Sequence, residues 1–149
     1  IATPLAARDS LGVFGQWGAF RDAEVPRCYA IATAEPSTRS RDVEPFASIG
    51  SWPQQRVRGQ LHLRLSRVPG ANASVTLNVG GTRFRLTTGG TDAWAASAED
   101  DTAIMAAMRA AGSMQVTGRD KRGANFTDRY SLDGAATAID AALVGCARR

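Results

Sequence analysis

His62 is the single histidine in this chain of 149 residues and the side chain best suited to acid–base catalysis near neutral pH. Ser66 or Ser131 could serve as its nucleophile, with an aspartate to orient the imidazole ring. Neither serine lies in a Gly-x-Ser-x-Gly sequence, and a histidine on the polar side of a strand is more often simply solvated. We therefore expect no catalytic residue, and we keep a hydrolase that uses His62 or a pair of carboxylates as the alternative.

Cys28 and Cys146 are the only cysteines, and they stand near opposite ends of the chain. They are too far apart for a Cys-x-x-Cys redox motif, and with one histidine they are too few for a structural zinc site. An isolated pair that spans most of a domain indicates a disulfide, which stabilises the fold by about 4–5 kcal/mol for a loop of ~100 residues. Because disulfides persist in oxidising compartments, we expect a periplasmic or secreted protein with no metal and no cofactor.

The acidic run Glu99, Asp100 and Asp101 could hold a cation, but it lacks the alternating ligands of a calcium loop. Acidic residues in the first turn of a helix favour the helix dipole, and this structural explanation is preferred. The glycine pairs at 80–81 and 89–90 lack the spacing of phosphate-binding loops, so they indicate turns.

Trp17, Trp52 and Trp94 could build an aromatic platform for a sugar, although tryptophans more often pack in a core or anchor a loop. Trp52 differs from the other two because it lies between Gly50-Ser51 and Pro53, in an expected loop or strand end. An exposed aromatic there is typical of a binding hot spot. Trp52 is therefore the first residue of the expected partner surface.

The turn Arg119-Asp120-Lys121-Arg122 is the second part of that surface. Its simplest interpretation is a solvated hairpin tip with a local ion pair. Its functional interpretation is contact with an anionic surface, such as lipopolysaccharide, or with an acidic protein. The candidate partner surface therefore comprises Trp52, Arg119, Lys121 and Arg122.

The net charge of +4 does not indicate a nucleic-acid interface. Lys121 is the only lysine among 18 basic residues, and the arginines are scattered along the chain rather than interleaved with aromatics on one stripe. No apolar run approaches the ~18–20 residues of a membrane span. We expect neither a nucleic-acid partner nor a transmembrane segment.

Hydrophobic alternation predicts the strands that must position these residues. The clearest case is residues 60–65, where Leu61, Leu63 and Leu65 share one face. The Gly80-Gly81 pair predicts a hairpin between two alternating segments. Residues 2–10 are expected to form an arm, and residues 35–43 a polar loop. The expected strands cover residues 13–20 (broken at Gly15 and Gly18), 28–32, 46–52, 60–65, 75–79, 84–86, 114–116 and 126–132.

Two helices are expected in the second half of the chain. Ser97 predicts the start of the first, and Gly112 its left-handed C-terminal residue. Asp133 predicts the cap of the second, whose apolar face includes Cys146 and so directs it inward toward Cys28. The apolar positions at helical spacing are Ile104, Met108 and Ala111 in the first helix, and Ile139, Leu143 and Cys146 in the second.

The order of these packing and turn residues is similar to that of a known family. The matching segments are residues 75–84, Asp92-Ala93-Trp94-Ala95 with Asp100-Asp101, 106–109, Gly118-Arg119, Arg122-Gly123, Asp128, Tyr130-Ser131-Leu132, Gly134, Ala138 and Cys146, with Trp17 and Cys28-Tyr29-Ala30 at the start. Together they resemble the invasion-associated locus B family of bacterial exported proteins, across nearly the whole chain. This chain departs from the family at Ala135, where a Phe is usual, and at Asp120, where a Ser is frequent. The resemblance implies export, a β-rich fold and a link to host-associated bacteria, and it implies no catalytic mechanism.

The sequence thus predicts a mainly β fold with two flanking helices (α+β), an antiparallel sandwich or barrel-like meander with one disulfide. Residues 1–10 form an arm and residues 11–149 a single domain. The expected function is a non-enzymatic, exported binding or accessory protein whose partner is an envelope protein, a host protein or an anionic surface. The alternatives are a cell-envelope hydrolase and a small-ligand carrier with its pocket inside the β-layers.

Overall fold

Alternating apolar residues build ten strands in the part of the chain that the computed structural model describes, residues 8–147. All neighbouring strands are antiparallel and form one sheet in the order β1-β2-β3-β4-β5-β8-β7-β6-β9-β10. The strands are β1 (Arg8–Phe14), β2 (Trp17–Asp22), β3 (Arg27–Thr33), β4 (Phe46–Trp52), β5 (Val57–Arg64), β6 (Thr76–Val79), β7 (Thr82–Gly89), β8 (Asp92–Ala95), β9 (Ser113–Arg119) and β10 (Asn125–Ser131).

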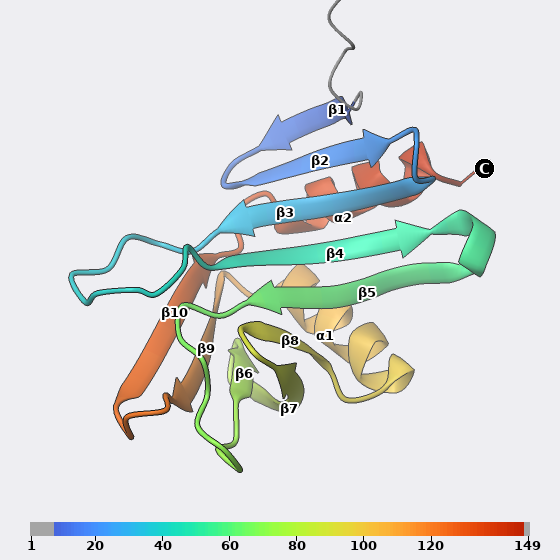
Figure 1. Cartoon of the computed structure of the whole chain (residues 1–149). Coiled ribbons are helices and arrows are strands. Elements are labelled where there is room, and N and C mark those ends of the chain that lie inside the picture. The colour runs from blue at the N-terminus through green and yellow to red at the C-terminus, as the bar shows by residue number, and fades with distance from the viewer. Residues whose placement is uncertain (1–7, 148–149) are drawn as a thin grey trace, which may run out of the picture.

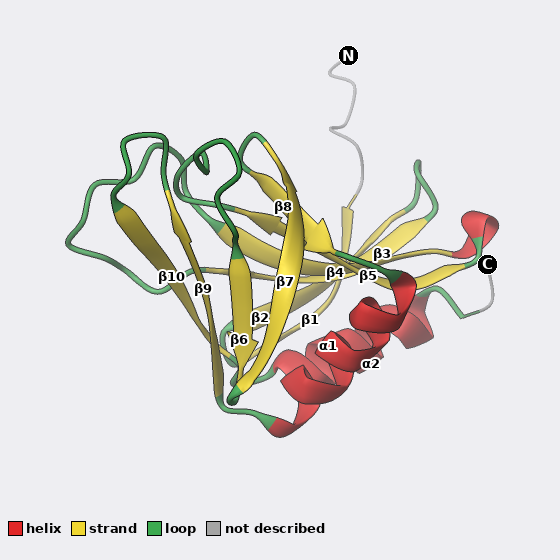
Figure 2. Cartoon of the chain, turned by 90° about the horizontal axis from the view of Figure 1, so that it is seen from below, coloured by secondary structure: helices red, strands yellow, loops and turns green. Residues whose placement is uncertain are grey.

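The sheet bends between β5 and the strands that follow, so that its two halves enclose a shared core (Figures 1 and 2). Helix α1 (Ala98–Ala110) packs on β5 to β8, and helix α2 (Ala135–Gly145) packs on β1 to β4. Both helices lie on the same side of the sheet and touch each other (Figure 2). The predicted mainly β fold with two flanking helices in a single domain is confirmed.

The alternation in β5 has the expected structural result. Leu61, Leu63 and Leu65 are at most 1% exposed and belong to the core. Trp17 is also fully buried, and its indole Nε1 donates a hydrogen bond of 2.9 Å to the carbonyl of Ser131. Trp17 is therefore a core residue and cannot belong to a surface platform.

The disulfide between Cys28 and Cys146 is confirmed. It joins β3 to the end of α2 across 118 positions of sequence, with the two Cα atoms 5.9 Å apart. Both cysteines are buried. The bridge therefore fastens the C-terminal helix to the first half of the sheet.

The sequence prediction is wrong at the start of the chain. Residues 13–20 form no single strand, because the chain turns back at Gly15, whose φ is +55°. Gln16 donates its backbone N–H to the carbonyl of Asp133, which holds this turn against the start of α2. Strand β1 begins at Arg8, so residues 8–10 belong to the sheet and not to an arm; the rest of the predicted arm lies outside the described residues.

Two predicted helix ends are also wrong. Ala111 leaves α1 in an extended conformation, and Gly112 has no positive φ, because its carbonyl accepts a hydrogen bond from Leu132 and leads directly into β9. The residue that precedes α2 is Gly134, with φ +86° and no side-chain cap. A Cβ at Gly134 would overlap the carbonyl of Phe14, so the close approach of the β1–β2 turn requires glycine there.

Three carbonyls on the outer edge of β10 accept hydrogen bonds from other parts of the chain. The backbone N–H of Glu35 donates to the carbonyl of Arg129 (2.7 Å), and the guanidinium of Arg39 to that of Asn125 (3.4 Å). The indole of Trp17 occupies a third carbonyl on this edge, that of Ser131. No helix within residues 8–147 is long and apolar enough to cross a membrane.

Candidate functional site

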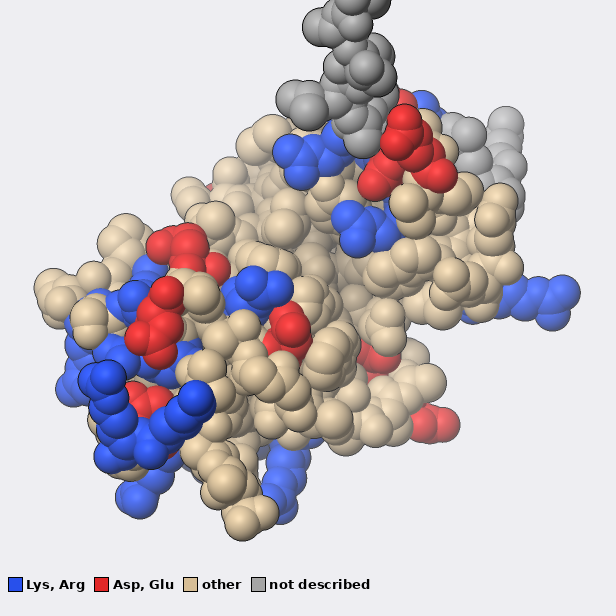
Figure 3. All heavy atoms as spheres, viewed as in Figure 1, with Lys and Arg blue, Asp and Glu red and all other residues tan. Residues whose placement is uncertain are grey.

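The outer face of β3, β4, β5 and β8, opposite the helices, carries a groove of about 460 Å³ that we call the aromatic groove. Its side chains alternate with the core residues of the same strands: Cys28, Ala30 and Ala32 point inward from β3, whereas Tyr29 and Ile31 line the groove. Figure 3 looks onto this face, whose middle is largely uncharged. The groove lies outside the sheet and not between its layers, where the alternative of a small-ligand carrier places its pocket. Its principal lining residues are Tyr29, Phe46, Ser48, Trp52, His62 and Trp94.

The floor of the aromatic groove is formed by small residues in the middle of β4. Gly50 is paired with Tyr29 on one side and Gln60 on the other, and Ser48 is paired with Ile31 and His62. The ring of Trp52 extends over Gly50, since a Cβ added there would lie 2.9 Å from its Cη2 atom. The missing side chain at Gly50 thus makes room for the ring of Trp52, and the small residues of β4 line the groove between larger residues on the neighbouring strands.

Two arginines lie at the β1 side of the aromatic groove. The guanidinium of Arg27 lies over the rings of Tyr29 (4.5 Å) and Trp52 (5.9 Å), which is the geometry of cation–π contacts. Arg8 donates to the Tyr29 hydroxyl at 3.1 Å and lies over Phe20.

Neither Arg8 nor Arg27 forms an ion pair with any described residue. The Nε of Arg27 is buried without a hydrogen-bond partner. Asp22 stands between these two arginines in the strand register, but its Oδ1 accepts the backbone N–H groups of Glu24 and Val25 in the following turn. In the strand register Asp22 thus lies between two cations, and neither is tied to it by an ion pair.

His62 stands at the other end of the aromatic groove. Its ring stacks on Trp94, with centroids 5.8 Å apart, and meets Phe46 edge-on. Its Nε2 lies 2.9 Å from Oδ1 of Asp92, which also accepts from Nε of Arg64 at 3.1 Å. The hydrogen bond with His62 is the main reason that the pKa of Asp92 lies below its usual value.

The predicted catalytic partners do not meet His62. Ser66 is buried and its backbone N–H donates to Asp128, whereas the hydroxyl of Ser131 accepts from the backbone of Asp133. The nearest serine across the strands is Ser48, whose hydroxyl donates to the main-chain carbonyl of His62 at 3.5 Å and not to its ring. The groove thus holds a histidine–aspartate pair, without a serine hydrogen-bonded to the imidazole among the described residues.

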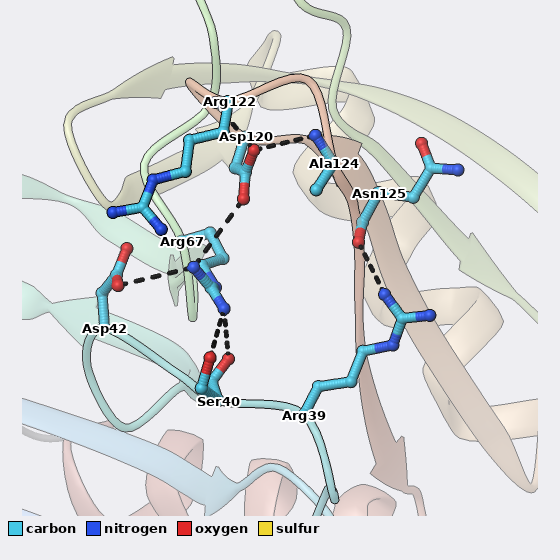
Figure 4. A network of polar contacts seen from close by, with 8 residues as sticks. All are labelled: Arg39, Ser40, Asp42, Arg67, Asp120, Arg122, Ala124 and Asn125. Atoms are coloured by element: carbon cyan, nitrogen blue, oxygen red, sulfur yellow. Dashed lines mark hydrogen bonds and ion pairs between the residues drawn. The ribbon is translucent and has the colours of Figure 1, made fainter.

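The turn at 119–122 has a different environment, which Figure 4 shows. Asp120 is 8% exposed and accepts the backbone N–H groups of Arg122 and Ala124, each at 2.9 Å. The hydrogen bond from Ala124 is the main reason that the pKa of Asp120 is lowered. The backbone of the turn also bonds to the preceding loop, through Gly70 N–H to the Arg119 carbonyl and Lys121 N–H to the Val68 carbonyl.

Arg67 organises the loops around this turn. Its Nη2 donates to the carbonyl and the hydroxyl of Ser40, both at 2.7 Å, and its Nη1 lies 3.6 Å from Asp42 and 3.8 Å from Asp120. The ion-pair partner of Asp120 is thus an arginine from another loop rather than a neighbour within the turn. Arg67 holds the 34–45, 65–75 and 119–125 loops together (Figure 4).

The structure does not bring the predicted partner residues together. Trp52 ends β4, whereas Arg119, Lys121 and Arg122 lie at the tip of β9 and β10, at the opposite end of the molecule in both views (Figures 1 and 2). All three basic residues are exposed. Figure 3 shows basic and acidic side chains crowded over this tip. Trp52 instead joins Trp94 and His62 in the aromatic groove.

Sequence reasoning missed the groove residues Arg8, Arg27, Tyr29 and Phe46, and it missed Asp92 as the hydrogen-bond partner of His62. The sequence feature that could have identified the groove is the set of residues that alternate with the core residues along the same strands. In 46–52, for example, Phe46, Ser48, Gly50 and Trp52 share a face and include two aromatics. Two large aromatic residues on the side of a strand that faces away from the core indicate a binding surface, because a face that contacts only water is usually polar.

No protein-family model matches this chain, and no curated protein and no solved structure was found to match it either. The resemblance to the invasion-associated locus B family therefore stays a prediction.

Proposed function

We propose that this chain is an exported, non-enzymatic binding protein of the invasion-associated locus B type, and that it holds its ligand in the aromatic groove. One observation carries the proposal: Arg8 and Arg27 lie against aromatic rings at the edge of the groove and have no ion-pair partner among the described residues. The residues that most often dominate the binding energy of an interface are tryptophan, tyrosine and arginine, and all three occur together here.

The size and composition of the groove support the same function. Small-molecule sites commonly have volumes of roughly 300–1,000 Å³, with aromatic walls and a few polar groups that orient the ligand. The aromatic groove has about 460 Å³, aromatic walls, and the polar groups of Ser48, Gln60 and His62.

The disulfide supports the proposed compartment. A single buried bridge that joins β3 to the end of α2 is stable where thiols are oxidised, which means the periplasm or the outside of the cell. Ligands of the groove are therefore to be sought among envelope and host molecules.

An array of envelope and host glycans, peptides and lipids, probed with the oxidised protein, tests this function. Hits are then titrated in solution against the wild type and against Trp52→Ala, with Lys121→Ala as the matched control at the opposite tip. We expect a ligand whose binding is lost in Trp52→Ala and kept in Lys121→Ala. Ligands that bind Trp52→Ala as well as the wild type would overturn the assignment of the groove.

A second candidate, the hydrolase, is favoured by the His62–Asp92 pair inside the groove. A histidine whose ring is hydrogen-bonded to a carboxylate can accept a proton from a water or hydroxyl. Turnover of chromogenic esters or glycosides that is lost in His62→Ala would establish this activity. Equal, background rates for the wild type and His62→Ala would remove it.

A further inference from the structure

We propose that the ligand of the aromatic groove is an acidic saccharide, with its carboxylate at Arg8 and Arg27 and the face of its ring on Trp52. This inference rests on the proposed function and adds the chemical class of the ligand. It is built from the charge of the groove, from the groups that its floor offers, and from the strands that form it.

Charge complementarity places the anion at one end. Arg8 and Arg27 flank Asp22 in the strand register, and the Oδ1 atom of Asp22 accepts backbone N–H groups of its own turn. At the far end, Arg64 and His62 both engage Asp92, so the charges there are balanced. A ligand that matches this distribution carries a negative charge at one end and neutral groups at the other.

The contacts of Arg27 with aromatic rings leave N–H groups of its guanidinium available to a carboxylate. The Cζ atom of its guanidinium lies 4.5 Å from the centroid of the Tyr29 ring and 5.9 Å from that of Trp52, so aromatic rings occupy part of its surroundings. The N–H groups of a guanidinium point outward in its plane, where a carboxylate can accept two of them. A carboxylate held there lies beside the ring of Trp52, and a sugar ring attached to it would rest on that ring.

The remaining surface suits a sugar better than an aliphatic acid. Aromatic rings carry a partial negative charge on their faces, which attracts the polarised C–H groups of a pyranose. Ser48, Gln60 and His62 offer a hydroxyl, an amide and a ring nitrogen along the same groove. Hydroxyl groups of a sugar can pair with the Gln60 amide and with the sites on Ser48 and His62 that their partners within the fold leave free, whereas an alkyl chain can use none of them.

The position of the groove in the sheet disfavours an extended peptide. Peptides that bind to sheets add a strand to a free edge and are held by main-chain hydrogen bonds. The floor of this groove belongs to β3, β4 and β5, each of which is already paired on both sides. Only side chains are available there, and a saccharide is a ligand that side chains alone can recognise.

Two matched oligosaccharides test the proposal: a trimer of galacturonic acid, and the same trimer with its carboxylates reduced to alcohols. Binding is measured by calorimetry and by tryptophan fluorescence on the oxidised protein. We expect the acidic trimer to bind at least tenfold more tightly than the reduced one, with an affinity that falls as salt is added.

Variants then assign the contacts. Arg27→Gln and Arg8→Gln are expected to reduce affinity for the acidic trimer about tenfold each and to leave the reduced trimer unaffected. Trp52→Ala should abolish binding of both, Trp52→Phe should recover part of it, and Lys121→Gln should change neither. Unchanged melting temperatures would show that the groove variants are folded.

The possible failures are distinguishable. Equal affinity for the two trimers, or wild-type affinity in Arg27→Gln, would overturn the acidic class while leaving the groove as a binding site. A peptide or a nucleotide that binds in a Trp52-dependent manner, while both trimers fail, would overturn the saccharide and retain the proposed function. Binding of the trimers that is insensitive to Trp52→Ala would overturn both.

Discussion

Arg67 and Arg27 lie at opposite ends of the same sheet, and their partners differ. Arg67 bonds to Ser40 and lies close to the carboxylates of Asp42 and Asp120, so that one side chain fastens three loops (Figure 4). Arg27 touches two aromatic rings and forms no ion pair with a residue of the described range. The first arginine is occupied within the fold, whereas the second lies against aromatic rings with its Nε buried and without a hydrogen-bond partner.

This difference separates structural from functional positive charge. The basic tip of β9 and β10 is the part that stands out in the sequence, yet its central aspartate bonds to its own turn and to Arg67. The arginines of the aromatic groove are isolated in the sequence and become neighbours only through strand pairing. The local density of basic residues is therefore a poor guide to which cations are free to bind.

The largest expected effect comes from the disulfide, which fastens the groove half and not the basic tip. Cys28→Ser, or reduction of the pure protein, should cost about 2–5 kcal/mol and lower the melting temperature on the order of 10 °C. Hydrogen exchange should rise more in β1–β4 and α2 than at the β9–β10 tip, which Arg67 holds. A melting temperature that reduction does not change would contradict the structural role of the bridge.

A matched pair of arginine variants comes next. Arg67→Ala should cost about 1.5–3 kcal/mol of unfolding free energy, because it removes hydrogen bonds to a charged group and leaves buried Asp120 without its cation. Arg27→Ala should cost less than about 1 kcal/mol, since it loses only contacts with rings near the surface. Chemical denaturation of both variants measures the difference. Equal losses of unfolding free energy in the two variants would contradict the structural difference between Arg67 and Arg27.

A smaller effect with opposite signs is expected from two carboxylates. Burial raises the pKa of Asp128, which lies in the middle of β10, so the ionisation of this carboxyl at higher pH opposes folding. Asp128→Asn should therefore melt above the wild type at pH 7, with a gap that narrows toward pH 4. In the groove, the hydrogen bond with His62 lowers the pKa of Asp92, so its contribution is present at neutral pH and lost on acidification.

Asp92→Asn is thus the control for Asp128→Asn. It should melt below the wild type at pH 7 and approach it as the pH falls below about 4. Melting curves of all three proteins between pH 3 and pH 8 test both signs. If the difference in melting temperature between a variant and the wild type is the same at every pH, ionisation of that carboxyl is not its cause.

The smallest effect is expected at the exposed end of the basic turn. The turn is held by the backbone N–H of Arg122 and not by its side chain, so Arg122→Ala should change the unfolding free energy by no more than about 0.5 kcal/mol. It should also leave ligand binding in the groove unchanged. A large loss of either would give this arginine a role that its contacts do not indicate.

Features that depend on neighbouring residues could be predicted from the sequence. Alternation placed Leu61, Leu63 and Leu65 in the core, the Gly80-Gly81 pair forms its hairpin, and Ser97 accepts the backbone N–H of Asp100 at the start of α1. Each of these follows from side chains within a few positions of one another. The disulfide was predictable for a different reason, since only one pairing of two cysteines exists.

The candidate site could not be predicted in the same way, because it depends on strand order and register. Asp92 reaches His62 only because β8 pairs with β5, although 30 positions separate the two residues. Gly50 makes a floor only because Tyr29 and Gln60 lie beside it. Gly134 likewise replaced the predicted Asp133 cap because the β1–β2 turn packs against it. Single-sequence periodicity identifies faces, but it does not say which faces are neighbours.

The covered edge of β10 has a consequence for how copies of this protein can associate. Extension of a sheet from copy to copy requires a free edge on both sides of each molecule. Loop 34–45 and Trp17 occupy one edge, whereas β1 pairs only with β2 among the described strands. Strand addition between copies would therefore pair β1 of one copy with β1 of another, and the assembly would stop at a dimer. The hydrogen bonds from loop 34–45 and Trp17 thus disfavour the addition of a further strand to β10.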